Sequence, residues 1–78
     1  PEVTVLAPED LRTALMDKLL EEAQELRDSD ASGRVEEMAD VMEVIEALLA
    51  HFDREQVAQV QSRKRMERGG FEKGYFLA

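Results

Sequence analysis

Two acidic pairs flank a polar break in the chain, and their symmetric placement constrains the fold more than any other feature of the sequence. Glu22 and Glu25 precede the polar segment 28–33, and Glu37 and Asp40 follow it. If the flanking segments are helices that fold back at the break, position 25 lies level with position 37, and position 22 lies level with position 40. Four carboxylates would then face each other at one height, and their repulsion would have to be relieved by cations.

The types and the spacing of these residues predict a magnesium site. A spacing of three residues places two carboxylates on adjacent turns of one helix face, so two such helices offer four oxygen ligands. Magnesium prefers hard oxygen ligands, and it keeps waters and substrate phosphates as its remaining ligands. Such a site points to phosphoryl chemistry, in which a water oriented by metal and carboxylate cleaves a phosphoanhydride.

Helix start and stop signals divide the chain into three helical segments. Pro8 and the two acids after it start the first segment, which runs to about Asp28, because proline suits the first turn and acids favour the positive end of the helix dipole. The second segment spans 33–52. Asp53 is an N-cap that opens the third segment, and Gly69 ends it in the left-handed conformation. The expected class is all-α, an antiparallel helical hairpin plus a third helix.

Apolar residues of the first two helices indicate how they pack. Glu22 falls inside the apolar stripe of the first helix, and Glu25 lies on its edge. The stripe consists of Leu11, Leu15, Leu19, Ala23 and Leu26. The second helix is apolar over more than half of its circumference, which implies contact with more than one helix. Because a chain of 78 residues buries a core only marginally, we expect a helical bundle completed by a second subunit, as a homodimer or homotetramer.

The two ends of the chain are predicted to be short and extended. Val3 and Val5 alternate with polar neighbours, as in a short strand, and the aromatic tail 71–77 is predicted to pair with this segment. The length fits a single domain over 1–78. The start at Pro1 rather than at a methionine suggests that an upstream part is missing or was removed.

Composition excludes several classes of partner. A net charge of −8 argues against electrostatic binding to nucleic acid or to acidic lipid. The chain has no cysteine, so it offers neither a disulfide framework nor a thiolate zinc site. No apolar run approaches the roughly 18 residues that span a bilayer, and no secretory segment opens the chain. A cytoplasmic protein without membrane or nucleic-acid partners is therefore expected.

A basic segment at the end of the third helix would complement the charge of a phosphate-containing substrate. It comprises Arg63, Lys64, Arg65 and Arg68, followed by Gly69 and Gly70. Basic side chains neutralise phosphate oxygens, and paired glycines let a backbone approach closely. The alternative is that the basic residues complement the negative end of the helix dipole and that Gly69 is only a C-cap.

The acidic motifs and the basic segment together resemble a known family. Residues 21–25 (EEAQE) and 36–40 (EEMAD) look like the EExxE and ExxD motifs of the all-α nucleoside triphosphate pyrophosphohydrolases, the MazG-like and phosphoribosyl-ATP pyrophosphohydrolase superfamily. Residues 18–20, 41–45 and 64–73 are similar to phosphoribosyl-ATP pyrophosphohydrolase-like members. The resemblance covers nearly the whole chain. Its acidic motifs are moderately specific, and their combination with the RGGF segment is more specific.

The resemblance implies an enzyme that hydrolyses an NTP-like substrate between the α and β phosphates. The products would be pyrophosphate and a nucleoside monophosphate, or phosphoribosyl-AMP. Four carboxylates would hold magnesium, or manganese in its place, and act in catalysis, and four basic residues would contact phosphates. The carboxylates are Glu22, Glu25, Glu37 and Asp40, and the basic residues are Lys18, Lys64, Arg65 and Arg68.

One departure from the family and two rival interpretations remain. Members of this type often begin with a basic segment that contains Arg-Asp-Lys, and nothing like it precedes Pro1. Either that segment is missing from this chain or phosphate binding differs. The first rival is a catalytically inactive helical oligomerisation or interaction module of the same fold. The second is that each acidic pair, in so acidic a chain, is only a solvated helix face.

Overall fold

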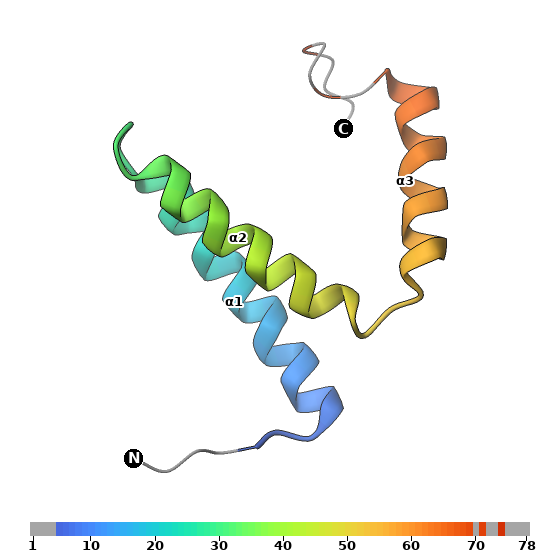
Figure 1. Ribbon diagram of the computed structural model, residues 1–78, viewed down its shortest axis with the longest axis horizontal. Coiled ribbons are helices and arrows are strands. Elements are labelled where there is room, and N and C mark those ends of the chain that lie inside the picture. Colours follow the sequence, from blue (N-terminus) through green and yellow to red (C-terminus); the bar gives the residue numbers. More distant parts are fainter. Residues whose placement is uncertain (1–4, 70, 72–73, 75–78) are drawn as a thin grey trace.

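The computed structural model describes residues 5–69, 71 and 74, which form three α-helices and no strand (Figure 1). The helices are α1 (Pro8–Asp28), α2 (Arg34–Leu49) and α3 (Arg54–Arg68). The predicted all-helical class is therefore confirmed for this part of the chain. None of these helices is long and apolar enough to cross a membrane.

Local chemistry explains most of the helix ends. Pro8 occupies the first turn of α1 with two acids behind it, as predicted. The Asp53 carboxylate caps α3 by accepting a hydrogen bond from the backbone N–H of Gln56 at 3.1 Å. Gly69 ends α3 with a φ of 81°, and its N–H donates to the carbonyl of Arg65 at 2.8 Å. That φ favours glycine, which has no Cβ to clash.

The end of α2 differs from the sequence prediction. The helix ends at Leu49, whereas the apolar pattern extended it to Phe52. Residues 50–52 form tighter turns instead, in which His51 N–H donates to Leu48 O at 2.9 Å and Phe52 N–H donates to Leu49 O at 3.1 Å. The extended backbone angles of Asp53, which caps α3, end the helical stretch altogether after these turns.

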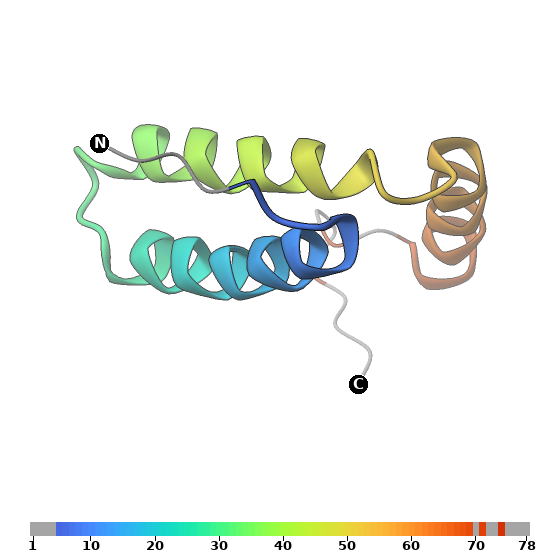
Figure 2. The ribbon, with the colours of Figure 1, turned by 90° about the horizontal axis from the view of Figure 1, so that it is seen from below.

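The helices α1 and α2 lie side by side and run in opposite directions (Figures 1 and 2). Their shared face contains the two buried apolar residues of the described chain, Val44 and Leu48, both on α2. On α1 the face consists of Leu15, Leu19 and Leu26, which are half-buried, together with Glu22. Glu22 lies within the stripe as predicted, whereas Leu11 and Ala23, which were predicted to belong to it, are exposed.

The third helix stands apart from this pair. In both views α3 lies beyond the C-terminal end of α2 and at an angle to it (Figures 1 and 2). The corner carries an ion pair in which Arg54 Nη2 lies 2.9 Å from Glu46 Oε2 and 3.1 Å from Glu46 Oε1. No residue of α3 is buried. The helix therefore contributes almost nothing to a core within one chain.

Large apolar side chains remain exposed on both α2 and α3. On α2 they include Val35, which is 80% exposed, and Met42, which is 52% exposed. On α3 they include Val57 and Met66. The wide apolar face predicted for the second helix is thus only partly covered by α1. Its contact with a second subunit stays a prediction.

Most of the predicted strand at the termini lies outside the described residues, on 1–4, 72–73 and 75–78. The described part of the tail was predicted to be extended and is a turn. Gly74 N–H donates to the carbonyl of Phe71 at 2.9 Å, and Gly74 has a φ of 80°. A φ of 80° lies outside the extended region, so Gly74 does not belong to a strand.

Candidate metal centre

Three acidic side chains from two helices converge where α1 and α2 pack. One carboxylate oxygen from each of Glu22, Glu37 and Asp40 lies within 4.8 Å of the other two. Glu22 belongs to α1, and the other two residues belong to α2. The equal distance of both motifs from the break accounts for the convergence, because a chain that reverses at the break brings the two motifs level. This group is called the acidic group below.

A side-chain hydrogen-bond network builds the reversal between the two helices. The Asp30 Oδ1 atom accepts hydrogen bonds from Ser32 N–H at 3.1 Å, from Ser32 Oγ–H at 2.8 Å and from Gly33 N–H at 3.0 Å. The hydrogen bond from the Ser32 hydroxyl, followed by that from the Gly33 N–H, lowers the pKa of Asp30. Before the turn, Ser29 Oγ–H donates to the Leu26 carbonyl at 2.7 Å. These contacts set the register in which the acidic residues meet.

Two carboxylate oxygens of the acidic group are buried without a hydrogen-bond donor. Glu22 is only 6% exposed, and its Oε2 atom has no hydrogen-bond partner among the described residues. The Oε2 atom of Glu37 is also buried and also lacks a hydrogen-bond partner among the described residues. A buried charged group without a partner costs about 1–3 kcal/mol or more. Two such oxygens in one group of carboxylates could be satisfied by a bound cation.

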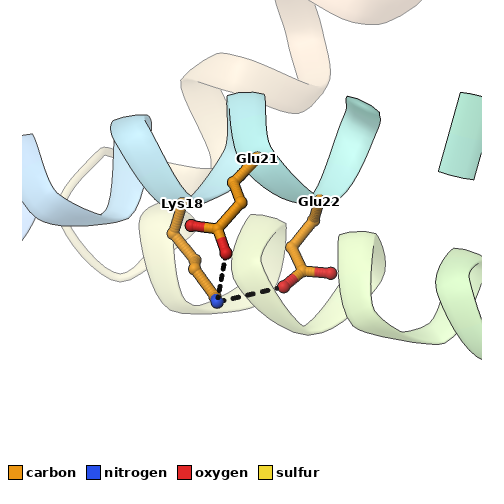
Figure 3. Close-up of polar contacts among 3 residues, drawn as sticks. All are labelled: Lys18, Glu21 and Glu22. Carbon is orange, nitrogen blue, oxygen red and sulfur yellow. Dashed lines mark hydrogen bonds and ion pairs between the residues drawn. The ribbon is translucent and has the colours of Figure 1, made fainter. Parts of the chain in front are cut away.

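Lys18 supplies part of the missing positive charge. Its ammonium lies 3.2 Å from Glu22 Oε1 and 3.3 Å from Glu21 Oε1 (Figure 3). The hydrogen bonds that the Lys18 ammonium donates to these two carboxylates, with that to Glu22 the larger effect, raise the pKa of Lys18. Lys18 was predicted as a phosphate contact, and here it pairs with a predicted metal ligand. Both ion pairs leave the lysine side chain 49% exposed.

Glu25, the fourth predicted ligand, lies beside the acidic group. Together with Glu21 and Glu22 it forms a second set of carboxylates within 4.8 Å of one another. Glu22 raises the pKa of Glu25. The larger cause is a hydrogen bond that protonated Glu25 can donate to Glu22, and the next is the repulsion between the two negative charges. When both are ionised, neither can donate, which is consistent with the unpartnered oxygen of Glu22. The charge of Glu37 acts on Glu25 in the same direction.

The basic residues of α3 lie elsewhere in the chain. Lys64, Arg65 and Arg68 line a pocket of about 390 Å³ on α3, with an apolar wall. The remaining lining residues are Val57, Val60, Gln61 and Phe71. Because α3 does not pack along the α1–α2 pair, these three residues do not join the acidic group within one chain. The sequence placed them in one site with the carboxylates, and the structure of the single chain does not.

The donor set of the acidic group fits a hard divalent cation. It offers carboxylate oxygens alone, which suit magnesium and manganese, and it contains no histidine or cysteine of the kind that zinc favours. The two unpartnered buried oxygens are the observation that separates this group from an ordinary solvated acidic face. The residues present therefore fit the metal that the sequence predicted.

Comparison with protein-family models, with curated proteins and with solved structures found no match for this chain. Its function has therefore to be inferred from its own residues.

Proposed function

We propose that this chain is a magnesium-dependent nucleoside triphosphate pyrophosphohydrolase, which cleaves its substrate between the α and β phosphates. The products are a nucleoside monophosphate, or phosphoribosyl-AMP, and pyrophosphate. One observation carries the proposal: Glu22 and Glu37, each of which has a buried carboxylate oxygen without a hydrogen-bond donor, form one group with Asp40. The resemblance of the two acidic motifs to those of the all-α pyrophosphohydrolases supports the same activity.

The carboxylates have separate tasks in the proposed reaction. Glu22, Glu37 and Asp40 hold the ion from two helices, and Glu25 adds a carboxylate beside Glu22. Bound there, magnesium would polarise a phosphate oxygen and lower the pKa of a bound water. Glu25 is exposed at the edge of the group, where water reaches it. It would be suited to orient an attacking water and to accept a proton from it.

A second copy of the chain completes the proposed enzyme, as a dimer or a tetramer. Support comes from the exposed apolar residues of α2 and from α3, which buries nothing in its own chain. Charge complementarity supports the same arrangement. Helix α3 carries five basic residues against two acidic ones, whereas α2 carries one against five. Packing α3 of one copy against the α1–α2 pair of another would bring Lys64, Arg65 and Arg68 within reach of a metal-bound triphosphate.

The proposal is tested by screening nucleoside triphosphates and phosphoribosyl-ATP for release of pyrophosphate in the presence of Mg²⁺. Glu37→Gln and Asp40→Asn remove metal ligands, so turnover should collapse even at saturating substrate while the helical circular-dichroism spectrum persists. Glu43→Gln is the matched control, because Glu43 is an exposed glutamate of α2 outside the acidic group. Full activity in the Asp40→Asn variant would contradict the proposal.

Replacing the basic residues should affect the kinetics differently from replacing the carboxylates. A charge-assisted hydrogen bond to phosphate contributes about 1.5–3 kcal/mol, so Arg65→Ala or Arg68→Ala should lower kcat/KM about 10- to 150-fold. We expect the loss in kcat for at least one of them, because negative charge grows on the leaving pyrophosphate. Steady-state kinetics separates the two parameters. If both variants had the kcat and KM of wild type, the basic segment would only complement the helix dipole and would not contact phosphate.

The second candidate function is a catalytically inactive oligomerisation module of the same fold. It is favoured by the separation of the basic residues from the acidic group within one chain. An oligomer that binds no magnesium and releases no pyrophosphate from any nucleotide tested would establish this function in place of the enzyme.

A further inference from the structure

The ammonium of Lys18 already places one positive charge beside the acidic group. Its ammonium lies on Glu22 Oε1 at 3.2 Å, while the other oxygen of the same carboxylate is buried without a donor. Lys18 and Glu22 are four residues apart on α1, so one helix face carries both the ligand and its internal counter-charge. Figure 3 shows the ammonium held between the carboxylates of Glu21 and Glu22.

One ammonium cannot neutralise this group. Three carboxylates lie within 4.8 Å of one another, and Lys18 contributes a single positive charge. A divalent cation that uses Glu22 as a ligand would also repel the nearby ammonium. The lysine side chain is 49% exposed on a flexible stem, so it can swing into solvent without any backbone movement.

We propose that Lys18 is the resident counter-cation of the metal-free site and that it leaves Glu22 when a divalent cation binds. The ion pair and the bound metal are mutually exclusive, and the displaced ammonium becomes available to a phosphate of the substrate. This inference rests on the proposed metal site. It assigns Lys18 a positioning role, in which the lysine stabilises the empty site and competes with its metal.

The test is Lys18→Met, with melting temperature and Mg²⁺ affinity measured separately. The metal-free variant should melt about 2–5 °C lower than wild type, because the repulsion in the site is no longer relieved. Its Kd for Mg²⁺, measured by calorimetry, should be about 2- to 5-fold tighter, because the competitor is gone. Arg27→Met is the control: it removes one exposed positive charge from the same helix and should leave the Kd within a factor of about 1.5 of wild type.

The opposite signs of the two effects distinguish this role from others. If Lys18 merely supported the fold, its replacement by methionine would lower both the melting temperature and the Mg²⁺ affinity. Either a weaker or an unchanged Kd in Lys18→Met overturns the inference. If wild type itself binds no Mg²⁺, the proposed function fails together with the inference. If wild type binds and only the Lys18→Met Kd is unchanged, the proposed function stands and the inference falls.

A measurement on the unaltered protein covers the case in which the variant does not fold. The chain has three lysines, Lys18, Lys64 and Lys73, so their side-chain NMR resonances are few enough to assign. Titration with Mg²⁺ should shift the Lys18 resonance towards the position of a free lysine, with the same Kd as calorimetry. A Lys18 resonance that stays unchanged at saturation would overturn the proposed displacement.

Discussion

Replacing Glu22 by glutamine should stabilise the metal-free protein and abolish its response to magnesium. The substitution keeps the size of the side chain and removes one of the charges that meet between α1 and α2. Glutamine also brings an amide donor to a group in which two buried oxygens have none. The same residue therefore weakens the fold without metal and strengthens it with metal.

The expected magnitude follows from the spacing of the carboxylates. Two unit charges 4.8 Å apart repel by about 0.9 kcal/mol in bulk water and by about 3.5 kcal/mol at an effective dielectric constant of 20. Glu22 takes part in two of the three pairs, so its neutralisation removes roughly 2–7 kcal/mol of repulsion. The lost pairing with Lys18 offsets part of this gain. If the net gain in the free energy of unfolding is at least about 1 kcal/mol, the melting temperature rises by about 4–8 °C or more.

Thermal melts in EDTA and in Mg²⁺, at one fixed protein concentration, measure both effects. A ligand present at about 100 times its Kd adds roughly 2.7 kcal/mol, so magnesium should raise the melting temperature of wild type by about 10–20 °C. Glu22→Gln should melt above wild type in EDTA and gain little from magnesium. The Glu43→Gln variant, with the same change of charge on an exposed residue of α2, should keep the full magnesium response. A Glu22→Gln protein that melts below wild type in EDTA, or that keeps the wild-type magnesium shift, would refute the reasoning.

Three further predictions concern pH, the turn and the assembly. The raised pKa of Glu25 means that the folded state binds its proton more tightly than the unfolded state does, so this stabilisation is present below the ordinary value of 4.5 and is lost as pH rises through the raised value. Melts of wild type and Glu25→Gln against pH in EDTA should reveal this loss as a difference, and parallel curves would exclude it. Asp30→Ala removes the acceptor of three hydrogen bonds and should lower both the melting temperature and the Mg²⁺ affinity, whereas Asp30→Asn, which keeps an accepting oxygen, should lose less of both. Sedimentation equilibrium at micromolar concentration should give a dimer or larger, and a folded monomer would contradict the proposed assembly.

Local signals in the sequence predicted the helix ends where a residue acts alone. Proline at the start of α1, the Asp53 cap and the left-handed Gly69 each determine the backbone around them, and the structure agrees at all three. The end of α2 was missed because Ala50, His51 and Phe52 carry no stop signal of their own. The last turn tightens there into hydrogen bonds between residues three apart, a common change at helix ends that these residue types do not signal.

The acidic group was predictable because it depends on spacing. Equal distances from one turn predict that the two motifs meet when two helices pack side by side. Which carboxylates converge depends on the packing as well, because Glu25 was predicted to lie opposite Glu37 and lies beside the group instead. The pairing of Lys18 with Glu22 was available from the same rule, since lysine and glutamate four residues apart on a helix contact each other. The position of α3 was not predictable, because an amphipathic helix shows which face it buries and not which surface covers that face.

The most direct test of the account is the identity of the products formed from a nucleoside triphosphate, followed by ³¹P NMR in the presence of Mg²⁺. The account predicts a monophosphate and pyrophosphate in equal amounts, formed by wild type with the best nucleotide of the screen, suppressed by EDTA and lost in Asp40→Asn. Release of inorganic phosphate with a diphosphate would contradict the proposed bond cleavage. Pyrophosphate release that persists in EDTA or in the Asp40→Asn variant would contradict the role of the acidic group.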